Sequence, residues 1–211
     1  MRRIDRTAVS PPACLSAFHH STHGWHDVLP CKPAIRKALA EIQESHCAYC
    51  EGPLRAESHF EHFRRKNPDH FPELTFEWTN LFLCCSAREH CAWFKDRPKA
   101  TAYDPADLVK PDEENPDDSL YYHHNGEVRP RTGASRPHRA SCTIAVLNLN
   151  HVQLKAARAQ AVRRYWGPNG RDLEELMTWS AEDRRAYLCG EDETLRTTPF
   201  ATTIRHFLMA S

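Results

Sequence analysis

The stretch that decides the fold of this chain begins with Cys47-Ala-Tyr-Cys50 and ends with Cys85-Ser-Ala-Arg-Glu-His90-Cys91. Two thiolate pairs that come together from separate turns can complete a tetrahedral zinc site. Five residues separate Cys85 from Cys91, which is wider than the usual spacing of such a pair. We predict a structural zinc ion (Zn2+) with these ligands: Cys47, Cys50, Cys85 and Cys91.

Two other interpretations of the cysteines compete with a zinc site. One is buried free thiols, and the other is a thioredoxin-like redox pair, although no βαβ pattern surrounds Cys47. We expect a cytoplasmic protein, because the sequence has no apolar run long enough for a bilayer and no apolar segment behind its charged start. Thiols stay reduced there, so the nine cysteines indicate metal ligands and free thiols rather than disulfides. Cys84 is assigned to the core, and no role is assigned to Cys14, Cys31, Cys142 and Cys189.

The composition is that of a globular protein, with 40% hydrophobic and 27% charged residues among 211. The formal net charge is zero, so an argument for nucleic-acid binding must come from local patches. We predict an α+β fold, mostly helical, in which a zinc-stapled ββα core is surrounded by helices. The predicted parts are a helical segment at 1–46, the ββα core at 47–103, and a proline-rich arm followed by helices at 104–211.

Hydrophobic spacing and proline positions predict the individual elements. A helix is expected over 33–46, followed by a turn, a short strand, a loop, a second short strand and a helix. Phe76 and Trp78 alternate with polar neighbours as in a strand, and residues 81–83 form a buried strand. Residues 103–118 are expected to form an irregular arm. Further helices are expected at 151–166 closed by Gly167, at 172–179, at 180–188 with a weakened capping box of Ser180 and Asp183, and at 200–209.

One stretch of the C-terminal half is strongly basic. Between Arg129 and Arg171 there are nine lysines and arginines and no acidic residue. These charges could follow a phosphate backbone, or they could form a solvated face that docks on the acidic arm at 112–118. The candidate nucleic-acid contacts are Arg163 and Arg164 of this stretch, together with Arg64, Arg65 and Lys66 of the cysteine-rich segment.

Residues between and after the cysteine pairs suit the hydrolysis of a phosphodiester. This reaction needs a base for water and a divalent ion that neutralises charge on the departing oxygen. His62 suits the first role because its ordinary pKa lies close to 7, and Glu61 offers a hard oxygen ligand for Mg2+ or Mn2+. Lys95 could face phosphate or solvent. His62 could also be a zinc ligand or a surface histidine, but four cysteines already saturate a structural zinc.

The order Glu61-His62, Asn80 and Cys91-x-x-x-Lys95, enclosed by two cysteine pairs, resembles the HNH nuclease motif. Over about residues 33–155 the sequence resembles the PtuB-like HNH endonucleases of Septu systems and Septu-linked retrons. The segments that carry this resemblance are 47–51, 61–66, 74–82, 107–116, 126–128 and 147–150. The run at 107–116 is specific, because generic HNH domains lack it.

The resemblance implies an HNH (ββα-metal) fold, anti-phage defence, a nucleic acid substrate with DNA as first choice, and a PtuA-like ATPase of the ABC/SMC type as partner. In the family, the central Asn tethers the loop that carries the catalytic His, and this role falls to Asn80. Arg65 stands where the family usually has proline. Ala92 stands where many HNH enzymes place a metal-binding His or Asn, so the nearby candidates for the catalytic ion are His90 and Asp96.

Two non-enzymatic interpretations stay open at this stage. The chain could be a zinc module that only binds nucleic acid, or an adaptor that docks the ATPase through its basic half. The set of Glu61, His62 and Asn80 favours the enzyme, because a scaffold does not need it. The enzyme also requires that the His62 ring is accessible from a groove.

Overall fold

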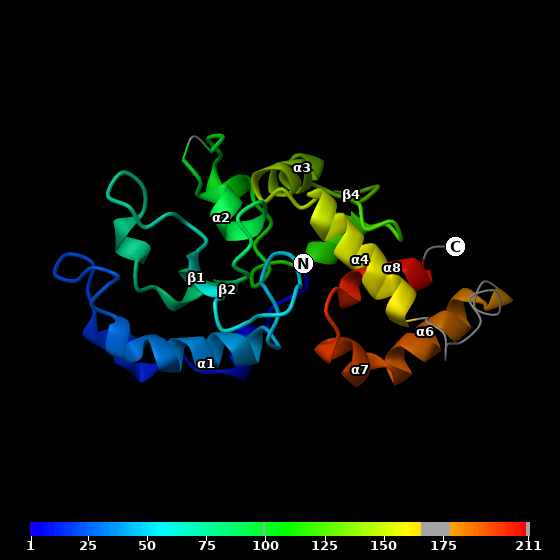
Figure 1. Cartoon of the computed structure of the whole chain (residues 1–211), viewed down its shortest axis with the longest axis horizontal. Helices are drawn as coiled ribbons and strands as arrows, with labels where there is room; N and C mark the ends of the chain where they lie inside the picture. Colours follow the sequence, from blue (N-terminus) through cyan, green and yellow to red (C-terminus); the bar gives the residue numbers. More distant parts are fainter. Residues whose placement is uncertain (99, 166–177, 210–211) are drawn as a thin grey trace.

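The computed structural model describes residues 1–98, 100–165 and 178–209 (Figure 1). Helix α1 (Lys32–Ile42) carries proline in its first turn and buries one face. The helix predicted over 33–46 is therefore confirmed, although it ends at Ile42. Its end is set by Gln43, whose side-chain amide bonds to both the N–H and the carbonyl of Leu83. Glu44 and Ser45 then have positive φ, which turns the chain away from the helix.

A two-stranded antiparallel sheet and a short helix follow α1. Strand β1 (His59–His62) pairs with β2 (Leu81–Cys84), so that His59 lies opposite Cys84 and His62 lies opposite Leu81. Helix α2 (Cys91–Lys95) comes next in the chain. In Figure 1 the two strands lie between α1 and α2. The mixed architecture of helices and small sheets agrees with the predicted fold class.

The strand-like pattern around Phe76 and Trp78 does not form a strand. Phe76 lies in a bend, and Trp78 begins a short 3-10 helix, Trp78–Asn80. The Glu77 carboxylate accepts a hydrogen bond from the Thr79 N–H, which favours this turn over an extended chain. The other 3-10 helices are Arg6–Ala8, Ala13–Ala17, Leu29–Cys31, Pro72–Leu74, Pro105–Asp107 and Pro116–Asp118.

The arm at 103–118 is irregular, as its prolines predicted, but it is followed by elements that the sequence analysis missed. These are the hairpin of β3 (Leu120–Tyr122) and β4 (Val128–Pro130), and helix α3 (Pro137–Val146). Gly126 in the hairpin turn has φ of +84°, and a Cβ there would clash with the carbonyl oxygen of Lys155. The predicted helix at 151–166 is found as α4 (Val152–Tyr165), while Gly167 lies outside the described residues.

The C-terminal helices form a second, smaller core with α4. They are α6 (Ala181–Gly190), α7 (Asp192–Thr197) and α8 (Ala201–Met209). The capping box of Ser180 and Asp183 is present, and α8 matches the helix predicted at 200–209. The helix predicted at 172–179 lies almost entirely outside the described residues. The smaller core contains Val162, Leu195, Ala201, Ile204 and Leu208.

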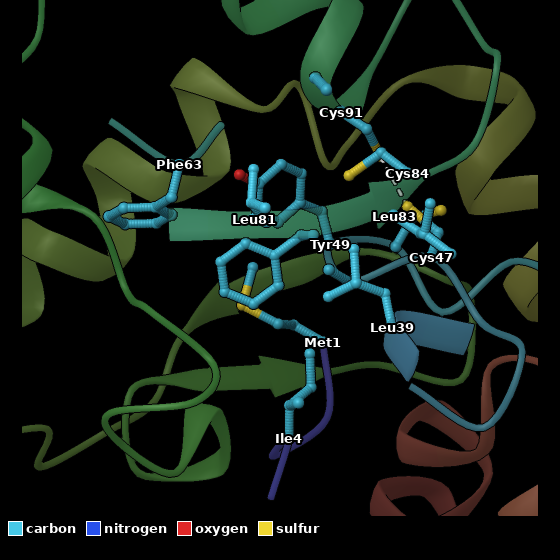
Figure 2. Close-up of a cluster of buried hydrophobic side chains, with 14 of the residues drawn as sticks. Met1, Ile4, Leu39, Cys47, Tyr49, Phe63, Leu81, Leu83, Cys84 and Cys91 are labelled. Carbon is cyan, nitrogen blue, oxygen red and sulfur yellow. Dashed lines mark hydrogen bonds between the residues drawn. The ribbon is translucent and has the colours of Figure 1, made fainter. Parts of the chain in front are cut away.

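The main core draws on all three predicted parts of the chain, from Met1 through the cysteine-rich segment to Leu154. Figure 2 shows its centre, where Met1 and Ile4 lie near Tyr49 beside the strand residue Leu81. The division of the chain at 46 and 103 stays a prediction. Across the part of the chain that the structure describes, no helix has the length and apolar character needed to cross a membrane.

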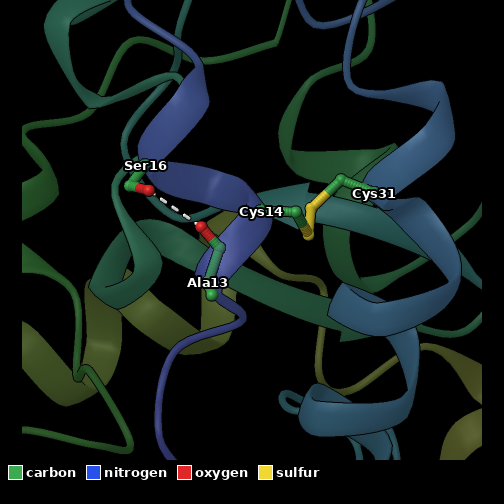
Figure 3. The surroundings of a disulfide bond; sticks show 4 residues. All are labelled: Ala13, Cys14, Ser16 and Cys31. Carbon is green, nitrogen blue, oxygen red and sulfur yellow. Dashed lines mark hydrogen bonds between the residues drawn. A yellow bond between two sulfur atoms is a disulfide. The ribbon is translucent and has the colours of Figure 1, made fainter.

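The N-terminal segment corrects the expectation that no cysteine forms a disulfide. Cys14 and Cys31 are bonded, with Cα atoms 5.8 Å apart (Figure 3). This distance is typical of a disulfide, and both residues lie in short 3-10 helices that fix their approach. The bond closes a loop of the chain between these two residues, which we call the N-terminal loop (residues 14–31). The remaining seven cysteines are free.

Candidate metal centre and active site

Four cysteine sulfurs converge at one end of the β1–β2 sheet. The sulfurs of Cys47, Cys50, Cys85 and Cys91 all lie within 4.8 Å of one another. The Sγ atoms of Cys47 and Cys91 are 3.9 Å apart, and those of Cys50 and Cys85 are also 3.9 Å apart. A zinc ion with Zn–S bonds of about 2.3 Å in tetrahedral geometry requires sulfurs separated by about 3.8 Å. Two of the sulfur pairs match this separation, and the cluster could hold a metal ion such as zinc.

Backbone geometry brings the four thiols together. Glu51 has φ of 63°, and the Cys47 N–H donates to the Gly52 carbonyl, so the first pair lies on a tight turn after α1. The Gly52 N–H donates to the Cys50 sulfur at 3.4 Å, and a Cβ on this glycine would lie only 3.3 Å from that sulfur. Cys85 follows β2 directly, and Cys91 begins α2. The wide spacing of the second pair is thus the loop between strand and helix.

His90 belongs to the cysteine cluster rather than to the groove that Glu61 borders. Its Nδ1 lies 3.1 Å from the Cys91 sulfur and 3.9 Å from the Cys85 sulfur. It lines a different groove, together with Cys50 and Cys85. The structure therefore does not bring His90 to the carboxylate of Glu61, with which the sequence analysis had grouped it as a ligand of a catalytic ion.

The opposite side of the ββα unit borders a groove of about 460 Å³. Its lining includes imidazole, carboxylate and cationic groups from β1, the loop after it, and α2. Those that matter below are Glu61, His62, Arg65, Lys66, Trp93 and Asp96. Trp93 is 47% exposed, and the guanidinium of Arg88 lies 5.6 Å from the centre of its ring. The groove therefore combines a histidine and two carboxylates with cations and one exposed aromatic surface.

A buried charge network forms the floor of this groove. The Lys95 ammonium contacts the carboxylates of Glu61 at 2.8 Å and Asp96 at 3.2 Å. The Tyr49 hydroxyl donates to the same Glu61 oxygen at 2.8 Å. Burial alone would lower the pKa of Lys95, but the two carboxylates outweigh burial and raise that pKa. Lys95 is thus a fixed cation between two carboxylates.

The position of Lys95 differs from the expectation that it faces phosphate or solvent. The residue is only 1% exposed, because α2 directs its side chain under β1. Its ammonium also donates to the carbonyls of His62 at 3.0 Å and Phe63 at 3.4 Å. Lys95 therefore holds the end of β1 and does not reach into the groove.

The His62 ring is held in one orientation at the edge of the groove. Its Nε2 lies 3.0 Å from the carbonyl oxygen of Thr75, which can only accept, so Nε2 carries the proton. Nδ1 then holds the lone pair, and it has no hydrogen-bond partner among the described residues. The ring packs against Trp25, and the residue is 6% exposed. Burial, with a smaller contribution from Lys66, lowers the pKa of His62 to about 3, so the ring is neutral at pH 7.

The low exposure of His62 departs from the expected open position. An enzyme was expected to present a His62 ring that is accessible from a groove. The ring does line the groove, but Trp25 covers part of it. This contact could not be predicted, because Trp25 is remote from the motif and belongs to the N-terminal loop.

Asn80 is hydrogen bonded to the loop that follows β1. Its Oδ1 accepts from the Arg64 N–H at 2.8 Å, and its Nδ2 donates to the carbonyls of Arg64 and Leu74, both at 3.0 Å. The residue is 3% exposed, so these bonds are shielded from water. The amide therefore fastens the backbone two residues after His62 to the loop before β2.

The candidate nucleic-acid contacts fall in separate places. Arg65 and Lys66 line the groove, although Arg65 also pairs with Asp96 at 2.8 Å. Arg64 lies next to them with its guanidinium 5.4 Å from the ring centre of Phe71. Arg163 and Arg164 are exposed near the end of α4, and Arg164 lines another groove.

The basic stretch does not form one continuous exposed surface over its described residues. Arg158 is fully buried and donates to the carbonyls of Gly126 and Leu149. Arg139 makes two hydrogen bonds to Glu114 of the acidic arm. Arg139 therefore agrees with one of the two interpretations left open by the sequence, in which the basic stretch docks on the acidic arm. Arg171 lies outside the described residues.

Comparison with known proteins gives one informative match. A 57-residue stretch of the chain is 42% identical to Septu protein PtuB of Bacillus thuringiensis. This stretch is 26% of the chain, and it covers 21% of the length of PtuB. No protein-family model matches the chain. The match supports a PtuB-like relationship for part of the chain.

Two site residues were not found from the sequence. Tyr49 lies between the two cysteines of the Cys-x-x-Cys turn, and its hydroxyl donates a hydrogen bond to Glu61. Thr75 orients His62 through its backbone carbonyl, which no side-chain pattern can reveal. A buried tyrosine in so polar a turn was the one available signal, because a buried hydroxyl needs a partner.

Proposed function

We propose that this chain is an HNH endonuclease that hydrolyses phosphodiester bonds of nucleic acid, with DNA as the preferred substrate. The observation that carries the proposal is the His62 ring, fixed through Nε2 on the Thr75 carbonyl, with its lone pair on Nδ1 at the edge of a groove. A neutral imidazole has a lone pair that can accept a proton from water, and the negative phosphate of a bound substrate would raise the lowered pKa of His62 toward the range that a general base needs. Lys95 holds the backbone at His62, and Asn80 holds it two residues later, at Arg64.

A divalent ion such as Mg2+ or Mn2+ would be held by Glu61, with Asp96 as a second ligand. Both carboxylates border the groove, and the hydrogen bonds to Glu61 use only its Oε1, which leaves Oε2 without a partner among the described residues. Magnesium sites commonly use one or two carboxylates, water and substrate phosphates, so Glu61 could serve through Oε2, whereas Asp96 would have to give up its ion pair with Arg65 or Lys95. The ion would supply charge neutralisation on the departing oxygen. Arg65 and Lys66 would attract the phosphate backbone.

The similarity to PtuB supports a role in anti-phage defence, with a PtuA-like ATPase as partner. The matched stretch is short, so we infer this role together with the nuclease activity and not separately from it. A Septu-type effector that degrades nucleic acid would need both the nuclease activity and the association with the ATPase. The cysteine cluster, with a zinc ion bound, would then stabilise the fold of the nuclease core.

One observation favours the non-catalytic alternative, namely the 6% exposure of His62. A zinc module that only binds nucleic acid, or an adaptor for the ATPase, would tolerate a covered histidine. It would not need a ring with one nitrogen fixed on a carbonyl and the other left free. We therefore rank this alternative second.

The test is a nuclease assay of purified His62→Ala beside the wild type, with and without the ATPase. Removal of a positioned base typically costs about 10² to 10⁴ in rate. We expect cutting to be lost while zinc content, melting temperature and ATPase association stay unchanged. His124→Ala, an exposed histidine of the β3–β4 turn, is the matched control. Cutting by His62→Ala at the wild-type rate would support the scaffold instead.

The same assay tests the divalent ion. Wild-type activity should require added Mg2+ or Mn2+. It should disappear at EDTA concentrations that leave the thiolate-bound zinc in place, as shown by metal analysis of the treated protein. Full activity in EDTA with zinc retained would contradict a catalytic role for Glu61 through a metal ion.

A further inference from the structure

The N-terminal loop reaches across to the His62 ring. The ring centres of Trp25 and His62 are 4.6 Å apart and nearly perpendicular, with an interplanar angle of 84°. Trp25 also packs on Phe60 at 5.7 Å and on Phe76 at 6.2 Å. Trp25 thus lies between β1, which carries His62, and the segment after Thr75. The hydrogen bond from His62 Nε2 to the Thr75 carbonyl depends on a constant spacing between these two segments.

The loop that carries Trp25 is itself firmly attached. Its ends are joined by the Cys14–Cys31 disulfide, and Val28 within it is fully buried in the main core. Phe18 adds a second aromatic contact to Phe76, at 5.5 Å. The loop therefore has two aromatic anchors and a covalent closure, which suits a fixed support better than a flap.

Trp25 leaves the groove side of His62 free. Among the described residues, those that line the groove come from 59–70 and 92–100, and none comes from the N-terminal loop. His62 is one of them, and its Nδ1 is the nitrogen without a partner. Trp25 thus contacts the ring without closing the groove over it.

We propose that Trp25 is a positioning residue of the active site, which clamps the His62 ring against the Thr75 carbonyl so that Nδ1 faces the groove. This inference rests on the proposed nuclease function. Without Trp25 the ring can rotate about its side-chain bonds and exchange which nitrogen carries the proton. Displacing a catalytic group by about 1 Å can cost about 10²-fold in rate, although substrate binding is unchanged.

Two readouts test the clamp in the full-length protein. In steady-state cutting of a DNA substrate, Trp25→Ala should lower kcat about 10- to 100-fold with KM nearly unchanged. Trp25→Phe keeps a ring on Phe76 and should recover most of the loss. Leu29→Ala, a 67% exposed residue of the same loop, is the matched control and should behave as the wild type. Nitrogen NMR of the His62 ring, assigned by its absence in His62→Ala, should show one tautomer in the wild type and a mixture in Trp25→Ala.

The outcomes separate failure of the clamp from failure of the nuclease. Faster cutting by Trp25→Ala would make the loop a lid and overturn the proposal, as would an unchanged kcat with an unchanged tautomer. If the wild type does not cut at all, the proposed function fails, but the NMR comparison still decides whether Trp25 fixes the ring. Should Trp25→Ala not fold, Trp25→Leu and Trp25→Phe provide the same kcat and tautomer comparison.

Discussion

The two ends of the β1–β2 sheet carry different chemistry. Where His59 pairs with Cys84, the chain runs on into the cysteine cluster, in which four sulfurs lie within 4.8 Å of one another. Where His62 pairs with Leu81, nitrogen and oxygen groups border a groove and are held from behind by buried partners. Four thiolates around one point suit a structural metal ion. Side chains such as His62 and Glu61, in which one atom is hydrogen bonded and the other is available, suit proton transfer or metal binding. The cysteine cluster thus lies at one end of the sheet, while the groove runs along β1 from His59 to His62.

The largest expected effect is at the cysteine end. Structural zinc sites contribute folding energy outright, so Cys47→Ser should leave the chain unfolded or aggregated. Metal analysis of the wild type should find about one zinc per chain, and X-ray absorption should give Zn–S distances of about 2.3 Å. Circular dichroism and size-exclusion chromatography of the variant measure the loss.

Cys189→Ser is the control for this prediction, because Cys189 is exposed and free. It should fold and bind zinc as the wild type does. A folded Cys47→Ser protein, or a folded wild type that contains no zinc, would break the comparison, because the cysteine end of the sheet would then be held without a metal ion.

A smaller loss of stability is expected at the groove end. Lys95→Met removes the cation between Glu61 and Asp96 and leaves the buried Glu61 carboxylate with only the Tyr49 hydroxyl. Breaking a buried ion pair from one side typically costs about 3–5 kcal/mol of unfolding free energy. Urea unfolding monitored by tryptophan fluorescence measures this loss. Zinc should remain bound, because none of its expected ligands contacts Lys95 in the described structure.

The double variant Lys95→Met/Glu61→Gln sharpens this prediction. It removes both buried charges, so it should recover a substantial part of the lost stability while remaining inactive. If Lys95→Met alone were as stable as the wild type, the Lys95–Glu61 pair would contribute little, and the rigid floor of the groove would need another explanation.

Several features of the fold could be predicted from the sequence because their signals are local or have fixed chemistry. The cysteine pairs, the capping box at Ser180 and the proline at the start of α1 each have a short-range physical cause. Strand β1 was predicted less accurately, because His59–His62 does not alternate between apolar and polar residues. The segment Phe76–Trp78 does alternate in this way but forms no strand. There, the hydrogen bonds of Glu77 and Asn80 decided the local structure.

The supports of the site could not be predicted because they come from distant segments or from the backbone. Trp25 packs on His62 across 37 positions of sequence, and Thr75 acts through its carbonyl. The Cys14–Cys31 disulfide was missed because an assumed reducing compartment was applied to every cysteine. Arg158 was predicted to belong to the basic surface, because its sequence position does not reveal that it is buried and donates to two carbonyls.

The smallest expected effect compares two groups of positive charge. Lys66 lines the groove and has no ion pair among the described residues, whereas Arg163 and Arg164 lie near the end of α4, away from the groove lining. Each phosphate contact changes the slope of log K against log salt by about 0.9 on duplex DNA. Lys66→Glu should therefore make the slope shallower by about one contact, and Arg163→Glu/Arg164→Glu should leave it unchanged. Fluorescence anisotropy of a labelled duplex over a salt series measures both, with ATPase pull-down in parallel. A shallower slope in the α4 variant would extend the phosphate path beyond the groove, while loss of the ATPase alone would make the end of α4 a docking surface.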